Sequence, residues 1–288
     1  MTHPGLSVSG LFAVLPTPFA TDGSLDLASL ARLADATLEA GATALTALGF
    51  MGEANELDES ERDAVARTIR ASAVGTPLIV GVSGESHDLI GRRACTAVDL
   101  GADGLMISPA ADVPLADAVE AAATAGVPII VQDYPAASGV ELEAGDIAEV
   151  ARQQPLVVGA KVEAPPTSGK IAEIRRLAPN LGVVGGLGGL FLIDELRAGA
   201  TGVMTGAAVP DRLTGVLRTF PSDPASAERD WLALLPLLRL EAFAPFNLAA
   251  RKEVWRQRGV IASAFCRRRG AVLDERARED IRQALTLV

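Results

Sequence analysis

A single lysine inside a predicted strand is the first feature of this sequence that suggests chemistry. The run Leu156–Glu163 is apolar except for Lys161 and Glu163. Alternate side chains of a strand share a face, so Lys161 is expected to face the space that the strand encloses, together with Val157, Gly159 and Glu163. The opposite face carries only apolar side chains, those of Leu156, Val158, Ala160 and Val162.

A lysine at this position has two possible explanations. Only three of the 26 Lys and Arg residues are lysines, so a lysine here indicates a chemical need for an amine. Enclosure removes hydration from an ammonium and favours the neutral amine, which can form a Schiff base with a ketone. The alternative is a strand-end lysine whose ammonium reaches water or pairs with Glu163.

Polar side chains also gather where the neighbouring strand ends. In the run Pro128–Pro135, parity places Gln132 and Tyr134 in the same space as Lys161. Both are therefore candidate catalytic residues. The alternative for Tyr134, the only tyrosine, is a residue that caps the barrel with its hydroxyl in water. Two glycines would leave room beside the lysine stem, Gly81 and Gly159.

The segment Gly49–Glu53 follows another predicted strand and offers backbone amides to an anion. Two glycines bracket this turn, so its N–H groups are expected to hold a substrate carboxylate without a cation. Those amides belong to Phe50, Met51 and Gly52. Glu53 is either a proton carrier or a structural carboxylate that binds loop amides. The glycine run around Gly186 lacks the spacing of a dinucleotide fingerprint and is expected to approach a ligand or form a tight turn.

Eight short apolar runs, each followed by a helical segment, must position these residues. Strand then helix, eight times, predicts a closed (β/α)8 TIM barrel over residues 1–221. The runs are Leu11–Phe19, Ala44–Gly49, Pro77–Ser83, Gly104–Pro109, Pro128–Pro135, Leu156–Glu163, Gly182–Gly186 and Gly202–Ala207. After a break at Pro221–Pro224, residues 222–288 contain only helical patterns, at about 225–240, 243–258 and 274–287. They predict a C-terminal helical extension packed on the barrel.

Composition narrows the function classes. A net charge of -10 disfavours nucleic acid as a partner, so Arg267–Arg269 is interpreted as a solvated or interface patch. No apolar run reaches the ~18 residues of a membrane span, which favours a cytoplasmic protein without a membrane partner. Two cysteines and two histidines predict neither a disulfide framework nor a histidine-rich metal site, so metal-free chemistry is expected.

Several motifs resemble one known superfamily along essentially the whole chain. They are Pro16–Phe19, Gly49–Glu53, Ile107–Pro109, Gln132–Pro135, Gly159–Lys161 and Gly185–Gly186. This order resembles the dihydrodipicolinate synthase and N-acetylneuraminate lyase superfamily. The resemblance implies a (β/α)8 barrel with a helical extension, commonly a tetramer. It also implies that Lys161 is the Schiff-base lysine, with no other cofactor.

The sequence departs from the synthase itself at several positions. Phe50 and Met51 replace a threonine pair, Ala110 and Ala111 replace a tyrosine pair, and the proton-relaying tyrosine falls on Gln132. The expected arginine falls near Ala137. The chain more closely resembles the branch that contains 2-keto-3-deoxy-L-arabinonate dehydratase. That likeness rests on Val131–Pro135, Lys161–Pro165, Gly199–Gly206 and Gly259–Ser263.

These observations favour a Schiff-base lyase, a dehydratase or aldolase, that acts on a 2-keto acid, with a 2-keto-3-deoxy sugar acid as the best fit. Because Gln132 cannot titrate, the acid and base would be Tyr134, Glu53, a substrate group or water. The alternatives are a condensing enzyme like 4-hydroxy-tetrahydrodipicolinate synthase, or a barrel that binds a keto acid without turnover.

Two apolar helical segments predict self-association. Trp231–Leu238 and Phe243–Leu248 carry more apolar residues than one buried helix face needs. Burial against a second copy would produce a homo-oligomer, either a dimer or a tetramer. The alternative is a monomer whose extension packs entirely on its own barrel.

Overall fold

Eight parallel strands close into a barrel in chain order, with β1 paired to both β2 and β8. The computed structural model describes residues 6–242 and 246–288. The strands are β1 Gly10–Val14, β2 Ala44–Ala47, β3 Leu78–Gly81, β4 Gly104–Ile107, β5 Ile129–Asp133, β6 Val157–Val162, β7 Gly182–Gly185 and β8 Gly202–Thr205. All eight predicted strands and the TIM-barrel class are confirmed, with each strand shorter than its apolar run.

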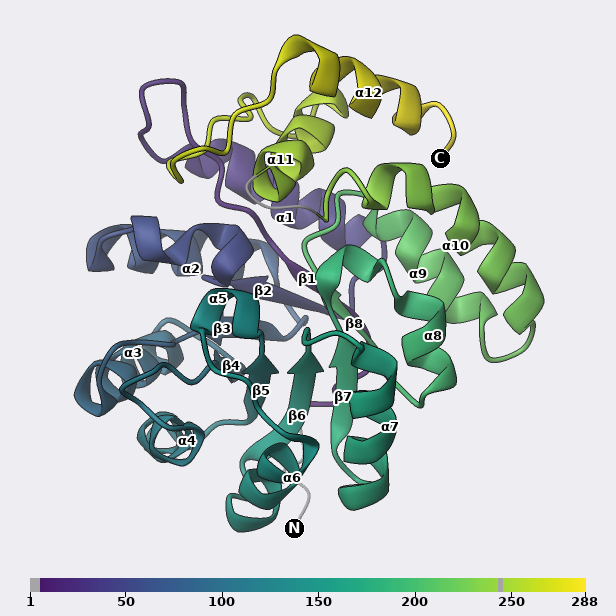
Figure 1. The fold of residues 1–288 in the computed structure, drawn as a ribbon. Coiled ribbons are helices and arrows are strands. Elements are labelled where there is room, and N and C mark those ends of the chain that lie inside the picture. Colours follow the sequence, from purple (N-terminus) through teal and green to yellow (C-terminus); the bar gives the residue numbers. More distant parts are fainter. Residues whose placement is uncertain (1–5, 243–245) are drawn as a thin grey trace.

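A ring of helices surrounds the strands (Figure 1). The barrel helices are α1 Leu27–Glu39, α2 Glu59–Ser72, α3 His87–Asp99, α4 Leu115–Ala123, α6 Ala144–Gln153, α7 Thr167–Leu177, α8 Leu192–Arg197 and α9 Pro210–Thr219. Shorter turns follow the carboxyl ends of three strands: η1 Phe50–Gly52, η2 Ala54–Glu56, α5 Pro135–Ser138 and η3 Leu187–Gly189. A capping box starts α2, in which the Asp58 carboxylate accepts from the backbone amide of Glu61 at 2.8 Å.

Two separate apolar cores flank the strands. A large outer core joins strands to helices, whereas a small inner core fills the barrel. The buried members of the inner core are Val8, Phe12, Val14, Ala44, Ile79, Met106, Ile130, Val184 and Met204. Polar side chains replace these apolar ones at the carboxyl ends of the strands, so the inner core forms the floor of the site.

The predicted facing of β6 is wrong at its start. Val157 belongs to the outer core and Val158 packs against the inner one, the reverse of simple alternation. A bulge explains this, because Ile129 pairs with Val157 whereas the next residue of β5 pairs with Gly159. Beyond the bulge the predicted parity holds, so Lys161 still faces inward.

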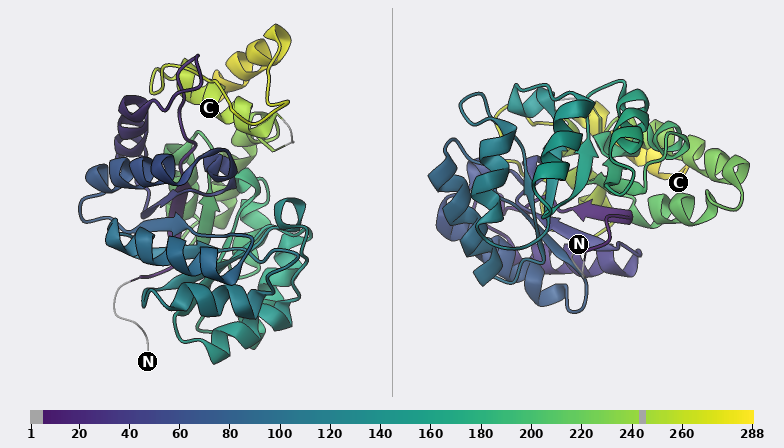
Figure 2. Two further views of the ribbon diagram at one scale, coloured as in Figure 1. Left: turned by 90° about the vertical axis from the view of Figure 1, so that its left-hand side faces the viewer. Right: turned by 90° about the horizontal axis from the view of Figure 1, so that it is seen from below.

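Three helices form the C-terminal extension: α10 Pro224–Leu238, α11 Asn247–Gln257 and α12 Glu275–Leu285. Helix α10 packs on α9 and α8. Figure 1 shows the strand arrows of β5 and β6 pointing toward the side where α11 and α12 lie, and in the left view of Figure 2 these two helices again lie at one end of the barrel. The three predicted helices are confirmed, although residues 243–245 of the second lie outside the described residues. In the described part of the chain, no helix is long and apolar enough to cross a membrane.

Candidate active site

Lys161 lies near the carboxyl end of β6 with its side chain almost wholly buried. It is 5% exposed, and its Nζ lies 2.9 Å from Oε2 of Glu163. The two glycines that were expected to make room for its stem are needed for other reasons. A Cβ on Gly159 would lie 2.8 Å from Val8, and one on Gly81 would lie 2.2 Å from the carbonyl oxygen of Leu48. Close packing therefore fixes both glycines.

Glu163 is the centre of the polar network around the lysine. Its Oε2 also accepts a hydrogen bond from Nε2 of Gln132 at 2.7 Å, and its Oε1 accepts from the amide of Leu187 at 3.1 Å. A Cβ on Gly186 would lie 2.3 Å from Oε1, so only glycine leaves room for the carboxylate. The ammonium thus has a proton acceptor beside it. Residues at the carboxyl ends of β5 and β7 hold this carboxylate in place.

Glu163 is not among the residues predicted from the sequence to be functional. Alternation puts it on the face of Lys161, but the sequence indicates only a possible ion pair between the two. Gln132 is 2% exposed and holds the same carboxylate oxygen as the lysine. An amide cannot titrate, so its contribution here is to orient Glu163.

Tyr134 stands at the rim, immediately after β5. Its ring meets that of Phe50 edge to face, with centroids 5.7 Å apart. Burial and the nearby charge of Glu163 raise the pKa of the Tyr134 phenol. The phenol is therefore fully protonated at neutral pH and can act as a proton donor. Its hydroxyl makes no hydrogen bond to any of the described residues.

The loop after β2 forms the 3₁₀ turn η1. The amides of Gly52 and Glu53 are used within the turn, on the carbonyls of Gly49 and Phe50. Among the described residues, the amides of Phe50 and Met51 have no hydrogen-bond acceptor. The turn is fixed from below, since Thr17 donates its hydroxyl to the carbonyl of Gly52 at 2.6 Å. Two of the three amides expected to hold a carboxylate are thus available.

The carboxylate of Glu53 is engaged by the extension. Its Oε1 lies 2.5 Å from Nζ of Lys252, and its Oε2 accepts from the amide of Arg268 at 2.7 Å. Arg268 also donates to the carbonyl of Phe50 at 2.7 Å, while Arg267 pairs with Glu61 at 2.6 Å. Of the predicted solvated or interface patch, Arg267 and Arg268 thus form an interface with α2 and with the loop after β2. No local pattern in the sequence indicates these contacts, because the partners are more than 200 residues apart.

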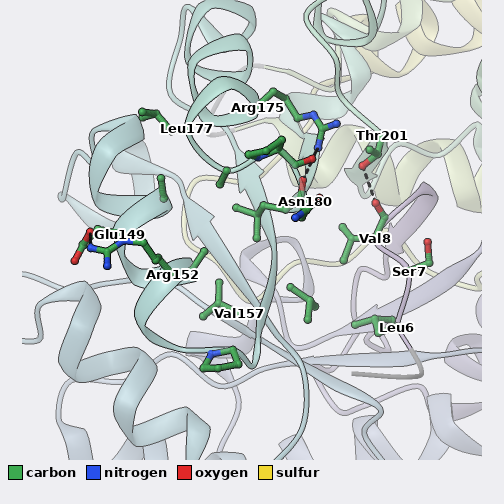
Figure 3. A pocket seen from close by; sticks show the side chains of 18 of the residues that line it. Leu6, Ser7, Val8, Glu149, Arg152, Val157, Arg175, Leu177, Asn180 and Thr201 are labelled. Atoms are coloured by element: carbon green, nitrogen blue, oxygen red, sulfur yellow. Dashed lines mark hydrogen bonds and ion pairs between the residues drawn. The ribbon is translucent and has the colours of Figure 1, made fainter. Parts of the chain in front are cut away.

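Two cavities bracket the barrel. A small one of about 20 Å³ lies at the mouth and is lined by Phe50, Ser83 and Gln132 among others. A larger one of about 710 Å³ lies near the amino end of β6, between α6 and α7 (Figure 3). Its Arg175 and Thr201 are already bonded to backbone carbonyls. Of the two cavities, only the small one at the mouth is lined by a member of the lysine network, Gln132. No metal-binding cluster of three His, Cys, Asp or Glu side chains occurs among the described residues.

A closed parallel barrel with a buried lysine and carboxylate at the carboxyl ends of its strands defines a (β/α)8-barrel enzyme. The chain belongs to the dihydrodipicolinate synthetase family, whose family model matches residues 7–287. Membership in this family, together with the relatives described next, makes the protein a lyase.

Relatives cover most of the chain. It is 36% identical to an L-2-keto-3-deoxyarabonate dehydratase of Azospirillum brasilense over 88% of this chain and 86% of that protein. It is 31% identical to a 4-hydroxy-tetrahydrodipicolinate synthase of Sorangium cellulosum over 81% of this chain and 80% of that one. Among solved structures, a dihydrodipicolinate synthase from Rhodopseudomonas palustris matches with a TM-score of 0.91 and 34% identity over 97% of each chain.

Proposed function

We propose that this lyase is a dehydratase of 2-keto-3-deoxy sugar acids that works through a Schiff base on Lys161, without a metal or organic cofactor. The observation that carries the proposal is the network of Lys161, Glu163 and Gln132, with a carboxylate 2.9 Å from the amine. Its 36% identity to a dehydratase of such an acid supports the substrate class.

The first half of the reaction activates the substrate. Glu163 accepts the ammonium proton, and neutral Lys161 attacks the C2 ketone. The C2 oxygen then leaves as water after it takes one proton from the amine and one back from Glu163, which becomes a carboxylate again. The resulting iminium acidifies the C3–H bond. Loss of a C3 proton to Glu163 then gives an enamine. Gln132 keeps the carboxylate aimed at the lysine throughout.

The second half eliminates water and releases the product. The enamine pushes out the C4 hydroxyl, which takes a proton from Glu163 or from the phenol of Tyr134 and leaves as water. Hydrolysis of the remaining iminium restores the free amine. Among the groups considered as acid and base, Glu163 is better placed than Glu53, whose carboxylate is bound by Lys252 and the amide of Arg268. The amides of Phe50 and Met51 would hold the substrate carboxylate.

A condensing synthase is the second candidate, favoured by the 31% identity to such an enzyme. A panel of 2-keto-3-deoxy acids, assayed by product mass spectrometry, separates the candidates. Dehydration gives a product lighter by one water, aldol cleavage gives two fragments, and condensation requires an added aldehyde and gives a heavier product. Thermal stabilisation by these acids without any product would instead indicate a binding barrel and would refute the proposal.

We also propose a homo-oligomer, a dimer or tetramer. Most of the apolar residues of α10 are buried within the chain itself, including Trp231, Leu234 and Leu237. Two apolar side chains remain exposed: Leu232 of α10 is 50% exposed, and Phe246, just before α11, is 48% exposed. Burial of these side chains against a second copy is the expected use. Light scattering tests this directly, because a mass near the 29.7 kDa of one chain would contradict it.

A further inference from the structure

The extension places a buried arginine over the barrel mouth. Arg251 on α11 is 4% exposed. Its Nη1 meets the sulfur of Met51, and its Nη2 would lie 3.1 Å from a Cβ on Gly188. Its Nε has no hydrogen-bond acceptor among the described residues. A guanidinium carries five N–H donors, and burial with so few acceptors is costly. The position therefore favours an acceptor that comes from outside the chain.

The nearby carboxylate of Glu241 does not fully balance this charge. It lies 3.5 Å from Nε of Arg251, beyond good hydrogen-bond geometry. Both of its oxygens are also 3.3 Å from the amide of Ala208. Burial, partly offset by Arg251, raises the pKa of Glu241 to about 7, so the carboxyl is partly neutral near neutral pH. Arg258 is a further cation near Glu241, and the charges of Glu163 and Arg268 act on Tyr134 together with that of Arg251.

Arg251 touches both loops that border the reactive lysine. Met51 belongs to η1, where the amides of Phe50 and Met51 have no acceptor among the described residues. Gly188 directly follows Leu187, whose amide binds the Glu163 carboxylate beside Lys161. Met51 also packs against the inner core, which puts its contact with Arg251 at the top of the barrel interior. An anion held here would meet the Arg251 guanidinium and the amides of Phe50 and Met51.

We propose that Arg251 binds the carboxylate of the 2-keto acid substrate together with the amides of Phe50 and Met51, so that the extension supplies a substrate-binding residue to the barrel site. The inference rests on the proposed function. Arginine suits the task because its planar fork matches a carboxylate with two parallel hydrogen bonds. The anion would also supply the acceptors that the buried guanidinium lacks.

Selectivity between an acid and its ester tests the proposal. Pyruvate and methyl pyruvate are trapped on the enzyme with borohydride over a concentration series, and the adduct on Lys161 is quantified by mass spectrometry. The wild-type enzyme should reach half-saturation at a lower concentration of pyruvate than of methyl pyruvate. Arg251→Gln should raise the half-saturating pyruvate concentration on the order of 10- to 100-fold and leave that for methyl pyruvate unchanged. Arg251→Lys, which keeps the charge without the fork, should fall between.

A control on the same helix separates binding from helix damage. Arg256 is exposed and pairs with Glu253 at 2.7 Å, and Arg256→Gln should keep the wild-type selectivity. An equal rise for acid and ester in Arg251→Gln, or no rise for pyruvate, would overturn the proposal. If circular dichroism shows that Arg251→Gln does not fold, Arg251→Lys takes its place, and wild-type selectivity in that variant would overturn the proposal. Failure of the wild type to trap either compound would refute the proposed function, whereas trapping with unaltered selectivity refutes only the role of Arg251.

Discussion

The barrel mouth and the junction between barrel and extension each contain a buried lysine–glutamate pair, yet the two pairs differ in what else surrounds them. At the junction, Lys252 and Glu53 are both fully buried and 2.5 Å apart, and Lys252 also donates to the carbonyl of Phe265 at 2.8 Å. At the mouth, Lys161 is 5% exposed and has Glu163 as its one carboxylate partner among the described residues. The junction pair has no exposed surface, whereas the mouth pair keeps some exposed surface through which a ligand can reach the amine.

The difference shows that burial and pairing do not by themselves make a lysine reactive. Burial lowers the pKa of Lys252, an effect that Glu53 partly offsets, yet no substrate could reach an amine with no exposed surface. The third lysine, Lys170, pairs with Asp133 at 2.9 Å. Every lysine of this chain therefore has a carboxylate partner, so their scarcity alone does not single out Lys161. Its place at the carboxyl end of a barrel strand does.

Replacement of the mouth lysine should have the largest effect on activity. Lys161→Met removes the amine that would form the Schiff base, so turnover of a 2-keto-3-deoxy acid should fall by at least ~10⁴-fold. The carboxylate of Glu163 keeps its bonds from Gln132 and the Leu187 amide, so the fold should persist. Steady-state kinetics and circular dichroism check the two parts, and residual turnover above a hundredth of the wild type would contradict the assignment.

The carboxylate of the mouth pair should matter for proton transfer more than for folding. Glu163→Gln keeps the shape but cannot accept a proton, so kcat should drop by ~10²–10⁴-fold while borohydride still traps some adduct on Lys161. The equivalent change at the junction, Glu53→Gln, should lower the free energy of unfolding. Equal effects of the two variants on kcat would remove the distinction between the pairs.

The junction lysine should matter for stability. Lys252→Met leaves Glu53 buried without its cation, which should cost about 3–5 kcal/mol in the free energy of unfolding. The double variant Lys252→Met/Glu53→Gln should recover part of that loss, since no buried charge then remains unpaired. Urea unfolding of the three proteins measures this. An unaltered urea midpoint in Lys252→Met would show that the pair does not anchor the extension.

Glu195 is a buried carboxyl with no lysine partner among the described residues, and it extends the comparison of the two pairs. Burial, partly offset by Thr167, raises the pKa of Glu195 to about 8. The folded state therefore favours the protonated form, and the stability that this gives is full below about pH 4.5 and is lost as the pH rises to about 8. Each pKa unit corresponds to about 1.4 kcal/mol.

Removal of that carboxyl should flatten the pH dependence. Glu195→Gln should unfold at higher urea than the wild type at pH 8, with a smaller change between pH 5 and pH 8, the range set by the raised pKa of Glu195. An exposed carboxylate on α10 provides the control, because Asp230→Asn should keep the wild-type slope. An identical slope in the wild type and Glu195→Gln would mean that Glu195 is not the group responsible.

The barrel and its inward lysine could be predicted because they depend on local patterns. Apolar runs of strand length, glycines after helices and strand parity are all written within short stretches. Parity failed at Val157 and Val158, because a bulge depends on the register with β5 and has no local signal. The branch likeness was also readable from short motifs, and the 36% identity to a dehydratase agrees with it.

The rest of the site could not be predicted because it is assembled from distant segments. The contacts of Arg251, Lys252 and Arg268 with the β2 loop span about 200 residues or more. Nothing in the charge pattern of the extension distinguishes these residues from solvated ones. Glu163 is the intermediate case, since its face was predictable but its partners at Gln132 and Leu187 depend on two other strands.

Trapping with pyruvate and borohydride, followed by peptide mass mapping, tests the account most directly. Reduction converts a Schiff base into a stable secondary amine, so the modified lysine can be located among the three. We predict one adduct, on the peptide that contains Lys161, and none on those that contain Lys170 or Lys252. Absence of an adduct, or an adduct on Lys252, would contradict the assignment of the barrel mouth as the reactive region.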